Sequence, residues 1–234
     1  MNTIFLRRYE PDDNKFPIRD NEVLRYSGYM GFKEPLQGEI QKIFSSVIEE
    51  NKDIFQFKIC YRRMPVLWEN GHPIFPFDYE GEDLVKAIEG CREMILFAAT
   101  VGVEIDRRIR IATYTSQTKA LFLQAFGAER VETLCDYFCE EINRELCSEN
   151  LCTVPRFSPG YGDLPLEIQR DFFRLLDCNR QIGVSLGDNL LMNPTKSVTA
   201  ILGIKEKTGD DRSFTKEVKC LGCNKKDCEF RNLK

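Results

Sequence analysis

The chain has 234 residues, of which 42% are apolar and 30% are charged, and its formal net charge is −4. This composition is typical of a globular protein, and the mild acidity provides no basic surface for nucleic acid. The longest apolar stretch, Met94–Ala99, is far shorter than the ~20 residues of a membrane span, and the first residues lack the apolar core of a secretory signal. We therefore expect a cytoplasmic protein whose partners are neither nucleic acid nor membrane.

The spacing of apolar residues predicts both helices and strands. In chain order, we expect helices over 20–28 and 36–51, a strand over 57–63, a hairpin of strands 66–68 and 74–77, a helix over 83–92, a strand over 93–100, helices over 104–113, 116–147 and 165–178, and a strand over 197–204. No linker interrupts this order. We predict an α+β fold, with one domain over residues 1–210 and a Cys-rich appendage over residues 211–234.

Histidine is almost absent, and this excludes several kinds of active site. The single residue, His72, lies in the turn Asn70-Gly71-His72-Pro73. A Ser-His-Asp triad would have to use this one residue. A two-histidine iron site or a three-histidine zinc site needs more histidines than the chain has. We interpret His72 as an ordinary turn residue, with a functional role as the less favoured alternative.

The last three of the ten cysteines form a metal-binding pattern. Cys220, Cys223 and Cys228 have the spacing C-x₂-C-x₄-C, and three thiolates suit zinc or an iron–sulfur cluster. Both usually take four ligands, so another residue or an exogenous group has to complete the site. The alternatives are a reduced Cys-rich tail and redox or disulfide chemistry. A disulfide framework is not expected in a chain without a secretory signal.

An unusual loop follows the long predicted helix. The segment from Pro155 to Pro165 contains three prolines and two glycines in eleven residues, so we expect it to be irregular but stiff. Arg156 offers a planar fork for a carboxylate, and Tyr161 offers an aromatic face and a hydroxyl. Together they favour an anionic or zwitterionic small molecule with an aromatic part. In the alternative interpretation the loop is structural, its Arg pairs with a nearby Glu, and its Tyr packs on a helix.

This loop resembles a known family. Arg156-Phe157-Ser158-Pro159-Gly160-Tyr161 is similar to the R-x-A/S-P-G-Y motif of the activation domain of cobalamin-dependent methionine synthase, which binds S-adenosylmethionine (SAM). Ala125–Glu132 resembles the family's long-helix segment, and Gly183–Leu186 with Met192–Val198 resembles its G-x-x-L…M-x-P…S-V stretch. The chain is similar to a compact, free-standing version of this domain. The resemblance implies a C-shaped domain with a twisted, mainly antiparallel sheet flanked by helices.

The resemblance also implies roles for particular residues. By match to the motif, Arg156 binds the SAM carboxylate, Ser158 contributes backbone contacts and Tyr161 contacts the ligand. A helix glutamate near the amino and sulfonium groups corresponds to Glu132, or to Thr133 if the match is shifted by one residue. The family's N-terminal aspartate corresponds to Asp12, Asp13 or Asp20.

The function implied is repair of an oxidised cofactor. The resemblance implies a SAM-binding subunit that supports reductive methylation of cob(II)alamin to methylcobalamin, with the cobalamin carried by a partner corrinoid protein and the electron supplied by a donor such as flavodoxin or ferredoxin. The chain is too short for the two catalytic barrels of methionine synthase, so we expect a component and not a complete catalyst.

Three other functions stay open at this point. One is an iron–sulfur or zinc-binding electron-transfer or interaction module for a corrinoid protein, with the cysteine tail as its working part. Another is an interaction module that no longer binds SAM. The last is a methyltransferase acting on a small substrate, although the usual strand, Gly-rich loop and helix of such enzymes are missing.

Overall fold

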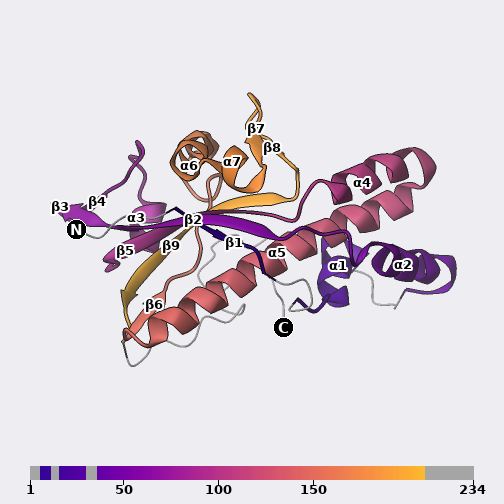
Figure 1. The fold of residues 1–234 in the computed structure, drawn as a ribbon, viewed down its shortest axis with the longest axis horizontal. Helices are drawn as coiled ribbons and strands as arrows, with labels where there is room; N and C mark the ends of the chain where they lie inside the picture. The colour runs from indigo at the N-terminus through magenta and orange to yellow at the C-terminus, as the bar shows by residue number, and fades with distance from the viewer. Residues whose placement is uncertain (1–5, 12–15, 30–35, 209–234) are drawn as a thin grey trace.

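The computed structural model describes residues 6–11, 16–29 and 36–208. They fold around a five-stranded sheet with the strand order β1-β2-β5-β9-β6 (Figure 1). The strands are β1 (Leu6–Tyr9), β2 (Lys58–Pro65), β5 (Glu93–Thr100), β6 (Leu151–Thr153) and β9 (Ser197–Glu206). Each neighbouring pair is antiparallel, which confirms the predicted antiparallel sheet with flanking helices.

Strand β5 shows why the sheet is buried on both sides. Successive residues of a strand face opposite sides of the sheet, and nearly every residue of β5 is apolar. Phe97 packs in the core on one face and Leu96 in the core on the other, and both are fully buried. The sheet therefore requires a layer of helices on each side.

The long helix α5 (Gln117–Cys147) covers the first face. Its buried residues include Phe126 and Phe138, and the ring of Phe138 lies 5.1 Å from that of Phe97 on β5. Helices α1 (Asp20–Tyr26), α2 (Gly38–Asn51) and α4 (Glu104–Thr115) pack against α5 (Figure 1). Because α1 is brought to α5, residues near the start of the chain lie beside the middle of the molecule.

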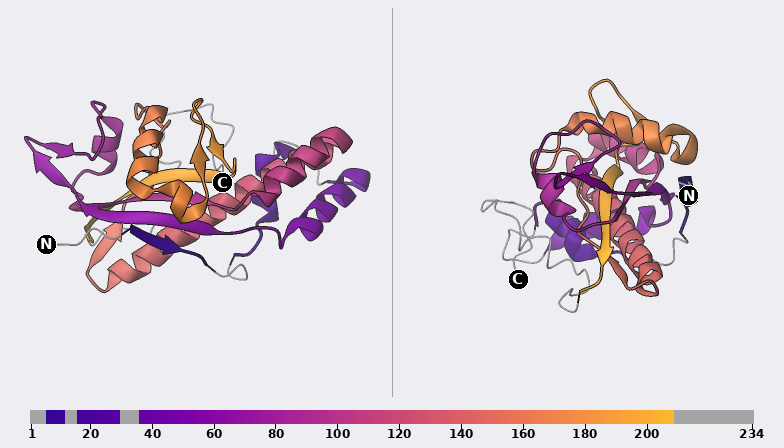
Figure 2. Two further views of the ribbon diagram at one scale, coloured as in Figure 1. Left: turned by 45° about the horizontal axis from the view of Figure 1, so that its top comes forward. Right: turned by 90° about the vertical axis from the view of Figure 1, so that its left-hand side faces the viewer.

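The opposite face is covered by α3 (Asp83–Ala87), α6 (Gln169–Leu176) and α7 (Cys178–Ile182). In the right-hand view of Figure 2 the sheet lies between the orange helices and α5. Phe172 of α6 is fully buried in this second core. A short 3₁₀ turn, η3 (Leu166–Ile168), connects the proline- and glycine-rich loop to α6.

Two small hairpins complete the fold. The first pairs β3 (Leu67–Glu69) with β4 (His72–Ile74), and the second pairs β7 (Ser185–Leu186) with β8 (Met192–Asn193). In the first, Asn70 and Gly71 both have positive φ, as a two-residue turn between twisted strands requires. The predicted hairpin is confirmed, although its second strand begins two residues earlier than expected.

Candidate functional site

The loop after β6 is held against the sheet by backbone hydrogen bonds. Val154 N donates to Gly203 O at 2.9 Å. Phe157 and Ile201 exchange two further bonds, 2.9 Å from Phe157 N and 2.7 Å from Ile201 N. Arg156 lies between these two anchors, so its backbone has a fixed position on β9. Phe157 packs in the core of the α6 face, and Arg156 extends in the opposite direction, toward α5.

Arg156 forms ion pairs with two carboxylates on α5. Its Nη2 donates to Glu132 Oε2, and its Nη1 lies 3.1 Å from Asp136 Oδ1. Glu132 and Asp136 are four residues apart, so they lie on the same side of the helix. The Arg156 side chain is 8% exposed and that of Glu132 is 33% exposed. One partner of the buried guanidinium is therefore accessible to solvent.

The electrostatic surroundings keep Arg156 charged. Burial alone acts to lower the pKa of Arg156, but the neighbouring Cys135, Glu132 and Asp136 outweigh it and raise the pKa above its ordinary value. The hydrogen bonding of this side chain is nevertheless incomplete. Nη1 makes no hydrogen bond with any group in the described part of the chain, despite its short distance from Asp136. The site thus contains a buried cation with a donor still available.

A second arginine, Arg19, reaches the same side of α5 from the residue before α1. Its Nε lies 3.1 Å from Glu129 Oε1 and its Nη1 lies 3.3 Å from Asp136 Oδ2. Its Nη2 also donates to Thr133 Oγ1. Residues 129, 132, 133 and 136 follow the helical spacing of three and four, so they form one polar stripe along α5.

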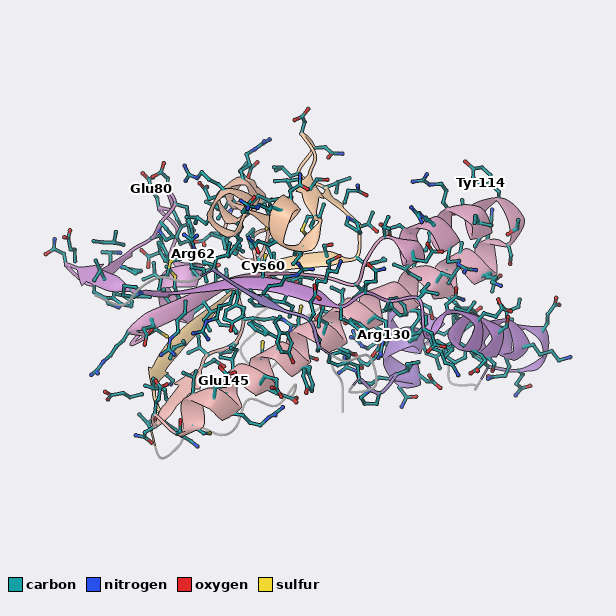
Figure 3. The ribbon with its side chains drawn as sticks, in the orientation of Figure 1. Cys60, Arg62, Glu80, Tyr114, Arg130 and Glu145 are labelled. Atoms are coloured by element: carbon teal, nitrogen blue, oxygen red, sulfur yellow. The ribbon has the colours of Figure 1, made fainter. Side chains whose placement is uncertain are left out.

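A buried ion pair between Glu129 and Arg130 lies at the N-terminal end of this stripe. Glu129 is bound by Arg130, whose Nε and Nη2 donate to it at 2.6 and 2.9 Å. Arg130 also donates to the carbonyls of Phe16 and Pro17, at 2.9 and 2.8 Å. Figure 3 shows Arg130 where α5 passes α1. These bonds satisfy two buried charges and attach the segment before α1 to α5.

Comparison with known proteins identifies the family. A sequence model of the vitamin B12 dependent methionine synthase activation domain matches residues 82–210, more than half of the chain. The chain belongs to this family. Among solved structures, it is similar to the MetH reactivation domain bound to AdoHcy, with a TM-score of 0.61 and 12% identity over 92% of this chain and 82% of that one. At this identity the likeness shows a shared fold. No match was found among curated protein sequences.

The structure places the four predicted SAM-binding residues of this activation domain in two groups. Arg156 and Glu132 are brought together, as both the ligand-binding and the structural interpretations of the loop allow. Ser158 and Tyr161 belong to a turn further along the loop, in which Tyr161 N donates to Ser158 O at 3.1 Å. Tyr161 is 66% exposed.

Several residues of the cluster, among them Asp136 and Arg19, were missed from the sequence. Asp136 follows Glu132 by one helical turn, and this spacing could have indicated it. No pattern pointed to Arg19, because its position depends on how α1 packs against α5. Of the candidate N-terminal aspartates, Asp20 is exposed at the start of α1, and Asp12 and Asp13 lie outside the described residues.

The predicted metal ligands Cys220, Cys223 and Cys228 also lie outside the described residues. Within the described ranges, no group of three or more His, Cys, Asp or Glu side chains is arranged to hold a metal ion. The same part of the activation domain has no helix with the length and hydropathy to cross a membrane.

A surface pocket of about 660 Å³ lies away from this cluster, between the β3–β4 hairpin and α3. Its lining includes His72, Lys86 and Arg92 together with Glu82 and Glu89. Acidic and basic side chains are balanced there, and none of them belongs to the stripe on α5. The buried and charged cluster around Arg156 is thus separate from this pocket.

Proposed function

We propose that this activation domain binds SAM at Arg156 and Glu132, through the amino-acid end of the ligand. The observation that carries the proposal is Arg156 Nη1, a donor on a side chain only 8% exposed that lacks a hydrogen-bond acceptor among the described groups. Nη1 keeps an ion-pair contact with Asp136 Oδ1 at 3.1 Å, so a ligand carboxylate adds a hydrogen bond to a group whose charge is already balanced. A hydrogen bond to a charged group contributes about 1.5–3 kcal/mol.

The charges of SAM complement the cluster. Its carboxylate suits the planar fork of Arg156, and its ammonium suits Glu132, which is accessible to solvent. In the free protein these two side chains pair with each other. Binding exchanges that internal ion pair for two pairs with the ligand, so neither side chain is left uncompensated. The related fold was crystallised with AdoHcy, which has the same amino-acid end as SAM.

We assign to Ser158 and Tyr161 the contacts with the rest of the ligand. The turn at Ser158 directly follows the segment anchored to β9, and its carbonyl accepts a hydrogen bond from Tyr161 N. The exposed ring of Tyr161 provides an aromatic face for the adenosine part. The turn is held in place by Asp163, which accepts hydrogen bonds from Tyr79 and from the backbone N–H of Glu82.

The proposed role is to orient SAM toward cobalamin carried by a partner corrinoid protein in the cytoplasm. One electron from a donor such as flavodoxin or ferredoxin reduces cob(II)alamin. The methyl group of SAM then passes to the reduced cobalt, which gives methylcobalamin and leaves S-adenosylhomocysteine. The cofactor supplies the reactivity, and the residues of this chain supply position and charge, so no side chain has to act as acid, base or nucleophile.

The test follows the cobalamin spectrum under anaerobic conditions. The cobalamin-binding domain of a methionine synthase, in the cob(II)alamin state, is mixed with SAM and a reductant, with and without this chain. We expect the chain to accelerate formation of methylcobalamin, and Arg156→Gln to slow it at least tenfold. Arg63→Gln, which removes a half-buried ion pair with Glu93 on the sheet, is the matched control. Formation of methylcobalamin at a rate independent of the chain contradicts the proposal.

A further inference from the structure

Arg19 lies in the N-terminal part of the chain, outside residues 82–210 that match the family. Its backbone begins α1, because its carbonyl accepts hydrogen bonds from Glu22 N and Val23 N at 2.8 and 3.1 Å. The preceding residues are attached to α5 through Arg130. The Arg19 side chain, which is 27% exposed, extends from this held backbone to Glu129 on α5.

Asp136 connects Arg19 to the proposed ligand-binding arginine. Its side chain is 18% exposed, and its two oxygens face different arginines. Oδ2 lies 3.3 Å from Arg19 Nη1, and Oδ1 lies 3.1 Å from Arg156 Nη1. A carboxylate shared in this way holds each guanidinium less strongly than a carboxylate with one partner.

The charges of the cluster balance only when Arg19 is included. Glu129 is neutralised mainly by Arg130, through two hydrogen bonds. Glu132 and Asp136 then remain to be neutralised by Arg156 and Arg19. Without Arg19, two carboxylates surround the single guanidinium of Arg156, and a third carboxylate from a ligand is repelled.

We propose that Arg19 is a positioning residue of the SAM site, an inference that rests on the function proposed above. By sharing Asp136, it keeps Asp136 from pairing fully with Arg156, so that Nη1 remains available to the ligand carboxylate. Arg19 acts through Asp136 and does not touch the ligand. Its effect is therefore confined to ligands that carry the amino-acid carboxylate.

The test uses two ligands and four forms of the full-length chain. The ligands are SAM and 5′-methylthioadenosine, which has the adenosine and the thioether but lacks the amino-acid end. The forms are wild type, Arg19→Met, Arg19→Met with Asp136→Asn, and the control Arg63→Met. Asn at position 136 keeps an acceptor oxygen but removes the negative charge that Arg19 offsets.

We expect Arg19→Met to weaken SAM binding at least fivefold and to change the affinity for 5′-methylthioadenosine less than twofold. The added Asp136→Asn change should restore SAM affinity to within threefold of wild type, and Arg63→Met should resemble wild type with both ligands. A structural role alone predicts neither the ligand dependence nor the rescue.

Three results overturn the inference while leaving the proposed function intact. They are an unchanged affinity of Arg19→Met for SAM, an equal loss of affinity for both ligands in Arg19→Met, and failure of the added Asp136→Asn change to restore SAM binding. A wild-type chain that binds 5′-methylthioadenosine but not SAM, or neither ligand, overturns the proposed function together with this inference.

Discussion

Arg156 keeps its charge in a buried position because Glu132 and Asp136 lie within ion-pair distance of it. Removing one partner of such a group leaves an uncompensated buried charge, which is strongly destabilising. In the proposed function, a ligand with a carboxylate and an ammonium avoids that cost, because its carboxylate pairs with Arg156 and its ammonium pairs with Glu132. The proposed exchange of ion pairs favours zwitterionic ligands over ligands with a single charge.

At the residue scale, Glu132→Gln should reduce recognition of the ligand's amino group. We expect about fivefold weaker binding of SAM, because a hydrogen bond to a charged partner is lost, at a cost of roughly 1 kcal/mol. An analogue of SAM without the α-amino group should bind wild type and Glu132→Gln equally well. Calorimetric titration of both ligands measures the difference.

Glu140→Gln, an exposed position on the same helix, is the control. If the variant discriminates between SAM and the analogue as wild type does, Glu132 does not bind the ammonium.

At the scale of elements, β9 determines the position of the loop that carries Arg156. Gly203 accepts the hydrogen bond from Val154 N and has close neighbours on its side-chain face. A Cβ at this position would lie 2.6 Å from Cys91 Sγ and 2.8 Å from Val154 Cγ2. A side chain there has to displace either the core or the loop.

Gly203→Ala should therefore lower the free energy of unfolding by about 1–3 kcal/mol, as overpacking of a core does. Denaturant unfolding measures the change. The double variant Gly203→Ala with Cys91→Ala relieves the closest contact, so its destabilisation should be smaller than the sum of the two single effects. Strictly additive effects would indicate that Gly203 and Cys91 do not compete for space.

The turn that carries Tyr161 depends on Asp163. Hydrogen bonds from Tyr79, Glu82 and Asp83 hold the pKa of Asp163 below its ordinary value of 3.8. Because the folded-state pKa is lowered, the stabilisation is fully present above that ordinary value and is lost as the pH falls through the lowered one. We expect Asp163→Asn to lower the melting temperature at neutral pH, with the difference from wild type disappearing in acid. Asp188→Asn, an exposed carboxylate, is the control, and a difference that persists in acid contradicts this assignment.

The long elements were predictable from the sequence, and the short ones were not. Helix α5 and strand β5 follow clear apolar patterns over many residues, and both are confirmed. Strands β1 and β6 were missed because they have only four and three residues, and their pairing partners are distant in the chain. The predicted helix over 165–178 begins instead as a 3₁₀ turn, and α6 ends where Asp177 adopts a positive φ.

The candidate site was partly predictable for a similar reason. Arg156 and Glu132 were found through motifs that are local in sequence, and the structure brings their side chains together. Asp136 lies on the same helix and required only the helical spacing. Arg19 is more than a hundred residues from its partners on α5, so only the packing of α1 could reveal it.

At the scale of the whole molecule, the site joins three separate parts of the chain. The segment before α1 contributes Arg19, and α5 contributes the carboxylates. The loop that is hydrogen-bonded to β9 contributes Arg156. The charged side chains are held by elements on the α5 side of the sheet, and the second core beneath α6 supports the loop from the other side. This arrangement is consistent with the proposed role of holding SAM in a fixed orientation for a partner.

The most direct test of the account is calorimetric titration of SAM into wild type, Arg156→Lys and Arg156→Gln under anaerobic conditions. Lys retains the charge beside Glu132 and Asp136 but lacks the planar fork, so it separates ligand recognition from folding. We expect saturable binding to wild type and at least tenfold weaker binding to both variants, equivalent to about 1.4 kcal/mol or more. Equal affinity of wild type and the folded Arg156→Lys and Arg156→Gln variants would show that Arg156 does not bind the SAM carboxylate, and would contradict the central claim.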